Sequence, residues 1–142
     1  MFKKVIFPID LEDLGSIEPH LKEIEKIIRY TQAELRVVTV LPGYTMPIIS
    51  SYLSADIVSK AKQNAAQELK NFMDQQLASD IKLSSHIREG RPHEQILAEA
   101  KEWQADLIVM PSHIKSKFST HIGSVAQRVS ERAKCSVLIL RA

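Results

Sequence analysis

The sequence predicts an α/β fold: a single-domain, doubly wound, five-stranded parallel sheet with helices on both faces. Apolar runs of strand length alternate along the chain with stretches whose apolar residues recur at helical spacing. These runs are nearly continuous, as expected for parallel strands that are buried on both faces. The length of 142 residues suits one domain. Because crossovers between parallel strands are right-handed, the favoured strand order is 3-2-1-4-5.

The N-terminal half contains two predicted strands and two predicted helices. Residues 5–9 form a short apolar run, and apolar residues at helical spacing then predict a helix over about 16–30. Residues 34–41, ELRVVTVL, predict the second strand. The segment 42–52 is rich in Pro, Tyr and Ser and is expected to be a loop, and apolar residues spaced through 57–73 predict a long second helix.

The C-terminal half repeats this alternation. Residues 81–89 alternate weakly and predict the third strand. Pro92 then opens a helix, where its missing N–H group costs no hydrogen bond. Residues 106–110, DLIVM, predict the fourth strand, 124–133 the fourth helix and 136–140 the fifth strand.

Composition excludes several classes of protein. Lys plus Arg number 19 and Asp plus Glu 17, so the net charge of +2 gives no basic face for nucleic acid. The single cysteine, Cys135, excludes an internal disulfide framework and a Cys-rich zinc site, and suggests a reducing compartment. No apolar run approaches the roughly 18–20 residues of a membrane span. The N-terminus, MFKKVIFPID, lacks the apolar stretch of a signal peptide, so we expect a cytoplasmic protein.

The predicted topology also indicates where a ligand would bind. In the order 3-2-1-4-5, strands 1 and 4 are neighbours at the topological switch point, and ligands of such sheets bind there, at the carboxyl ends of the strands. Asp10 follows the first strand, and Pro111, Ser112 and His113 follow the fourth. The segment SHIKSKFSTHIGS, residues 112–124, therefore borders the expected binding site.

Three stretches resemble the universal stress protein family: VIFPID, REGRPHEQILAEAKEWQADLIVMPSH and GSVAQRVSERAKCSVLIL. The resemblance covers the whole chain, so residues 1–142 are identified as one universal stress protein domain with an adenine nucleotide alpha hydrolase-like fold. The nucleotide-binding branch of the family carries G-x-x-G, nine residues and then G-[ST]. Gly123-Ser124 matches the last element, whereas Pro111 and Ile114 replace the first two glycines and the spacer is one residue shorter. In this the chain resembles the small enterobacterial F and G types.

The resemblance implies that ATP binds at the switch point, with Mg²⁺ held through its phosphates if the metal binds. Asp10 would accept hydrogen bonds from nucleoside hydroxyls or from the adenine amino group. The residues that we expect at the nucleotide are Pro8, Ile9, Asp10, Val40, Met110, Ser112, His113, Gly123, Ser124 and Val125.

Gly123-Ser124 has two interpretations. Ser124-x-x-Gln127 has the pattern of a capping box, which satisfies amides at a helix start. The same helix start could instead offer its N–H groups and positive dipole end to a phosphate, with Gly123 allowing close approach. Pro111 has no N–H to donate, so Ser112 and His113 would contribute side-chain donors in place of the family's backbone donors.

The fifth strand, from Cys135 to Arg141, is almost wholly apolar and lies at an edge of the predicted sheet. Edges of this kind are normally covered. We expect that the same strand of a second subunit covers it in a two-fold homodimer, as the resemblance also implies. The alternative is that a helix or the 42–52 loop shields it.

Three functions remain to be compared. The first is an ATP-binding stress module in which the nucleotide is a switch ligand; without a Walker lysine loop, we assign no catalytic residue and expect at most slow hydrolysis. The second is a nucleotide-free, dimeric interaction protein whose ATP site is degenerate. The third is an unrelated flavodoxin-like function. A receiver domain would need an Asp at the end of the third strand, where Arg88-Glu89-Gly90 stands, and a flavodoxin would need a Ser/Thr-rich phosphate loop after the first strand, where DLEDLG is acidic. The histidines show no metal-site spacing, so no metal ligand is assigned.

Overall fold

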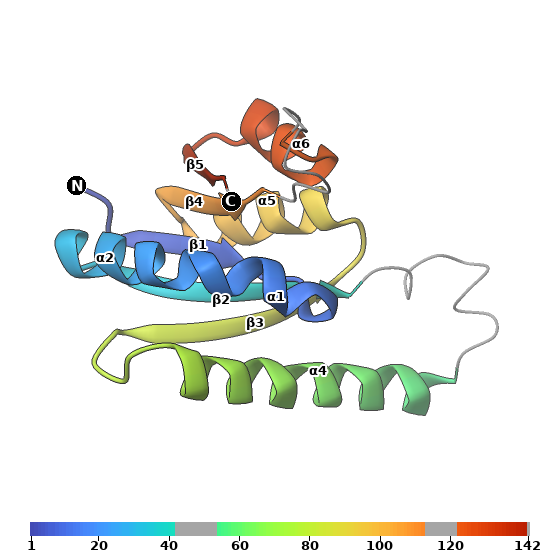
Figure 1. Ribbon diagram of the computed structural model, residues 1–142. Helices are drawn as coiled ribbons and strands as arrows, with labels where there is room; N and C mark the ends of the chain where they lie inside the picture. Colours follow the sequence, from blue (N-terminus) through green and yellow to red (C-terminus); the bar gives the residue numbers. More distant parts are fainter. Residues whose placement is uncertain (42–53, 113–121, 142) are drawn as a thin grey trace.

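The computed structural model describes residues 1–41, 54–112 and 122–141 (Figure 1). Within these ranges the strands form one parallel sheet of order β3-β2-β1-β4-β5, which confirms the predicted topology. The strand bounds are Lys4–Pro8 for β1, Glu34–Leu41 for β2, Leu83–Glu89 for β3, Leu107–Pro111 for β4 and Ser136–Leu140 for β5. The third strand begins two residues later than predicted.

Helices cover both faces of the sheet, as predicted. The α-helices are α1 (Leu14–Ile17), α2 (Leu21–Thr31), α4 (Ala55–Gln76), α5 (Pro92–Trp103) and α6 (Ser124–Arg132). Two 3-10 turns, η1 (Leu11–Asp13) and η2 (Glu18–His20), flank α1. Of the helices in the described ranges, none is both long and apolar enough to cross a membrane.

Two apolar cores lie on opposite faces of the sheet, because successive side chains of a strand point to opposite sides. On one face Val5 and Phe7 of β1 pack with α2 and α4. On the other face Ile6 packs with residues of α5 and α6, including Ile96 and Val129. β1 is therefore buried on both sides, which is why its sequence is a continuous apolar run rather than an alternating one.

The prediction of one continuous helix over 16–30 is wrong. Pro19 lies inside the predicted segment, and there the chain forms the 3-10 turn η2 between α1 and α2. Proline has no N–H group to donate, and its ring clashes with the carbonyl four residues earlier, so an α-helix cannot run through it unbroken. As a result α1 is short, and the segment that follows β1 is not continuous with α2.

Candidate functional site

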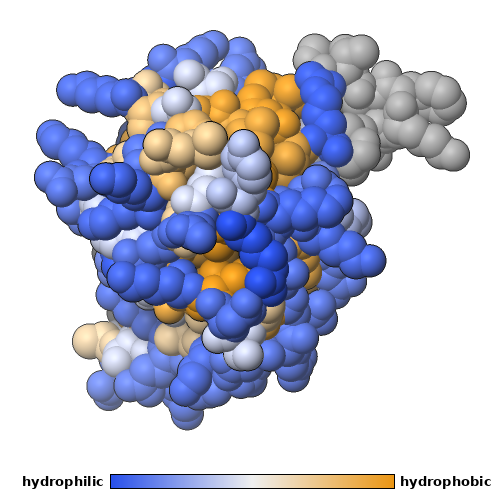
Figure 2. All heavy atoms as spheres, turned by 90° about the vertical axis from the view of Figure 1, so that its left-hand side faces the viewer, coloured by the Kyte–Doolittle hydropathy of each residue, from blue (hydrophilic) through white to orange (hydrophobic). Residues whose placement is uncertain are grey.

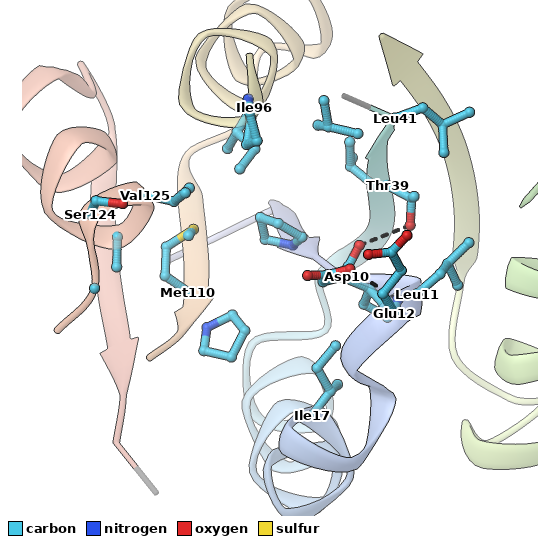
Figure 3. A pocket seen from close by; sticks show the side chains of 18 of the residues that line it. Asp10, Leu11, Glu12, Ile17, Thr39, Leu41, Ile96, Met110, Ser124 and Val125 are labelled. Atoms are coloured by element: carbon cyan, nitrogen blue, oxygen red, sulfur yellow. Dashed lines mark hydrogen bonds between the residues drawn. The ribbon is translucent and has the colours of Figure 1, made fainter. Parts of the chain in front are cut away.

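A pocket of about 610 Å³ lies at the carboxyl ends of β1, β2 and β4, between the N-terminal parts of α5 and α6 (Figure 3). This is the topological switch point of the sheet, where the sequence predicts a site. Eight of the ten residues expected at a nucleotide line the pocket: Pro8, Ile9, Asp10, Val40, Met110, Gly123, Ser124 and Val125. The strand order therefore brings together residues from both ends of the chain.

The other two expected residues differ from these eight. Ser112 is not part of the pocket wall: it is 3% exposed, and its backbone N–H donates to the carbonyl of Leu140 at 2.9 Å. Its hydroxyl is buried without a hydrogen-bond partner in the described chain. Ser112 thus continues the pairing of β4 with β5. His113 lies outside the described residues, as does Ile114.

Asp10 occupies the turn that leaves β1. It is the N-cap of η1: its Oδ1 accepts a hydrogen bond of 3.0 Å from the backbone N–H of Glu12, and its carbonyl accepts one from Asp13 at 3.0 Å. Caps of this kind fix a carboxylate in one orientation while leaving its second oxygen available. The side chain is exposed and faces the pocket (Figure 3).

Thr39 is a pocket residue that the sequence analysis missed. It is 2% exposed, and its hydroxyl donates a hydrogen bond of 2.9 Å to the carbonyl of Ile9. The N–H of Ile9 donates to the carbonyl of Val38 at 2.8 Å. These two bonds hold the end of β1 against β2. The available signal was the position of Thr39 directly before Val40, as the one polar residue in the apolar second half of the strand, VVTVL.

The N-terminus of α6 forms the opposite wall. Gly123, rather than Ser124, is the N-cap, with φ 83° and ψ 152°, a conformation that glycine adopts readily. The predicted capping box is therefore wrong: Ser124 is already helical, and the side chain of Gln127 donates to Glu131 at 3.3 Å instead. A glycine cap supplies no side-chain acceptor, and the first amides of a helix have no acceptor within the helix. This end of α6 suits an anion.

Helix α5 forms a third wall of the pocket, and its lining residues were also not predicted from the sequence. Pro92 and Ile96, in its first two turns, line the pocket. Next to them His93 is 6% exposed, and its Nε2 lies 3.4 Å from Nη1 of Arg132 on α6. A guanidinium only donates, so a hydrogen bond between these two atoms requires Nε2 to be the acceptor of a neutral ring. Burial lowers the pKa of His93, and the charges of Arg128 and Arg132 lower it further.

The pocket is polar at two opposite sides and apolar between them. Asp10 and Glu12 lie on the side of η1, and Ser124 and Val125 lie on the side of α6, with Met110 between the two (Figure 3). Among its described lining residues there is no lysine, arginine or histidine. In the described ranges no group of three histidine, cysteine or acidic residues is arranged to hold a metal ion. The arrangement suits a ligand with hydrogen-bond donors at one end and an anionic group at the other.

Strand β5 forms one edge of the sheet, where it pairs with β4. Its apolar side chains are only partly buried, and Leu138 is 39% exposed. Figure 2 shows apolar surface in the upper part of the face it presents, the region where Figure 1 places β5. The 42–52 segment, the alternative cover for this edge, lies outside the described residues.

Comparisons with known proteins agree with the fold. Universal stress protein MJ0531 of Methanocaldococcus jannaschii is 30% identical over 99% of this chain and 83% of its own length. Universal stress protein G of Escherichia coli O157:H7 is 24% identical over 99% of this chain and 100% of its own. The structure of protein MJ0577 covers 100% of this chain and 97% of its own, at 23% identity and a TM-score of 0.78. The universal stress protein family matches residues 1–141, and the chain belongs to this family.

Proposed function

We propose that this universal stress protein binds ATP in the pocket at the switch point of its sheet and uses the nucleotide as a switch ligand in the stress response. One observation carries the proposal: the pocket places a glycine-capped helix N-terminus opposite the acceptor carboxylates of Asp10 and Glu12 (Figure 3). A nucleotide has this polarity, because its phosphates are acceptors and its sugar and amino groups are donors. A universal stress protein whose fold matches this one with a TM-score of 0.66 was solved in complex with cAMP.

The chemistry of the walls orients the nucleotide. The phosphates lie at Gly123–Val125, where backbone amides and the helix dipole favour negative charge. The ribose lies near Asp10 and Met110, and adenine lies between the ends of β1 and β2, next to Val40. A Mg²⁺ ion would bind through the phosphates, because the carboxylates among the described lining residues lie on the other side of the pocket.

The proposal is for binding rather than catalysis. Asp10 and Glu12 are the carboxylates of the described wall, and both lie across the pocket from α6. In the proposed orientation neither is placed to activate water at a γ-phosphate. Hydrolysis is therefore slow at most. The proposed compartment is the reducing cytoplasm, which fits a chain with a single cysteine.

Two measurements test this function. The purified protein is denatured and the supernatant examined for adenine nucleotide by mass spectrometry, and ATP is titrated into nucleotide-free protein by calorimetry.

A matched pair of variants tests the role of the α6 amide. Ser124→Pro removes one amide at the first helical position, where proline is well tolerated, and Ser124→Ala removes the hydroxyl but keeps the amide. We expect Ser124→Pro to weaken ATP binding about tenfold or more, the effect of losing a hydrogen bond to a charged group, and Ser124→Ala to weaken it less.

A second candidate function is a nucleotide-free, dimeric interaction protein. Its supporting observation is the apolar edge of β5, which a second copy of the chain would cover. No released nucleotide and no heat with ATP would favour this function. The dimer itself is compatible with both candidates.

A further inference from the structure

Glu12 is a pocket residue that the motif of the family does not include. It lies in η1, and its backbone N–H donates to Oδ1 of Asp10 at 3.0 Å, so the turn that carries it is fixed. Its side chain lines the pocket on the same side as Asp10 and Thr39 (Figure 3). Within the described part of the chain, the Glu12 carboxylate has no hydrogen bond or ion pair. It is therefore an acceptor available to a ligand.

The position of Glu12 along the pocket determines which part of a nucleotide it can meet. A carboxylate repels phosphate, and the anion-binding end of α6 lies across the pocket. Asp10 lies between Met110 and Glu12 in Figure 3, at the level of the sugar in the proposed orientation. Glu12 lies beyond it, toward the end of β2, where the base is expected. The other polar side chain there, Thr39, already donates its hydroxyl to Ile9.

We propose that Glu12 selects the base of the bound nucleotide by accepting a hydrogen bond from its exocyclic amine. The inference rests on the proposed nucleotide function and adds a specificity-determining residue to it. An ionised carboxylate only accepts hydrogen bonds. Adenine presents a 6-amino group, which donates a hydrogen bond to the carboxylate. Hypoxanthine presents a 6-carbonyl instead, a second acceptor that the carboxylate repels. Glu12 thus favours adenine over 6-oxopurines.

The test compares ATP with ITP, which differ at this position of the base. Calorimetric dissociation constants are measured for the wild-type protein, for Glu12→Gln and for the control Glu18→Gln. Glu18 is an exposed glutamate of η2 outside the pocket wall. We expect the wild-type protein and the control to prefer ATP by about tenfold or more, since a hydrogen bond to a charged group has this effect. In Glu12→Gln the amide can donate to the 6-carbonyl, so the preference should fall to about twofold or reverse.

The outcomes separate the inference from the function beneath it. Because Glu12 is exposed, its replacement is expected to leave folding intact, which circular dichroism checks. If wild-type and Glu12→Gln proteins bind ATP and discriminate equally against ITP, the role of Glu12 is overturned while nucleotide binding stands. If the wild-type protein binds neither nucleotide, both proposals are overturned.

Discussion

The hydroxyl of Thr39 donates a hydrogen bond of 2.9 Å to the backbone carbonyl of Ile9 and so joins β2 to the residue between β1 and the Asp10 cap. Both residues are buried, at 2% and 3% exposure. A buried carbonyl without a partner is costly, because it has lost its hydrogen bonds to water. The shape of the pocket near Asp10 therefore depends on a side chain that itself offers no proton to a ligand.

Replacement of Thr39 by valine, which has nearly the same shape, should lower the free energy of unfolding by about 1–2 kcal/mol, because the Ile9 carbonyl loses a donor. Urea denaturation measures the change. Thr39→Ser keeps the hydroxyl and loses only a methyl group, so it should destabilise less. Equal stability of wild-type and Thr39→Val proteins would show that the hydrogen bond contributes nothing.

Two glycines give a second prediction, on the backbone at the helix starts. Gly123 has φ 83° and ψ 152°, so an alanine there is strained by about 1–3 kcal/mol. Gly15 lies in α1 without a positive φ, and an added Cβ would meet nothing within 4 Å. Gly15→Ala should therefore be neutral or slightly stabilising, because alanine favours helix. Thermal denaturation of the two variants compares them, and a Gly123→Ala protein as stable as Gly15→Ala would rule out the strain.

The sequence predicts the sheet and most of the pocket because both follow from apolar periodicity and from the strand order. Once β1 and β4 are neighbours, Asp10, Met110 and Gly123 must converge at the carboxyl end of the sheet. The break before α2 could also have been predicted from Pro19, because the effect of a proline on a helix is local.

The residues that were missed depend on contacts between distant elements. Pro92 and Ile96 enter the pocket only because α5 packs against β2 on the same face of the sheet as α6. Glu12 reaches it because η1 turns back at the Asp10 cap. The capping box at Ser124 failed for a different reason: glycine and serine are both accepted N-cap residues, and the cap lies at Gly123, whose positive φ favours glycine.

Acid should weaken the packing of α5 against α6 through His93. Burial, and next the charges of Arg128 and Arg132, lower the pKa of His93 below its usual value of 6.5, and Arg91 acts in the same direction while Glu94 opposes it. As the pH falls below about 6.5, the unfolded chain takes up the proton first, so stability decreases until the pKa of the folded state is reached. Burial also lowers the pKa of His20, so this residue contributes to the pH dependence with the same sign.

The measurement is the free energy of unfolding from pH 7 to pH 5. The wild-type protein should lose stability over this range. His93→Gln should lose less, and the double variant His20→Gln/His93→Gln less again, because each substitution removes a group whose proton uptake favours the unfolded state. An unchanged pH dependence in His93→Gln would exclude His93 as a contributor.

The last prediction concerns β5 as a contact between subunits. A lysine in place of Leu138, which is 39% exposed on this edge strand, puts a charge where a second copy would pack, and charged edges resist strand pairing. We expect the wild-type protein to sediment as a dimer at micromolar concentration and Leu138→Lys to shift toward the monomer. Tyr30→Lys is the control, because Tyr30 is 78% exposed at the end of α2 and belongs to a different element. A wild-type monomer, or a dimer that Leu138→Lys leaves intact, would show that β5 is not the contact, and the apolar edge would then need another cover.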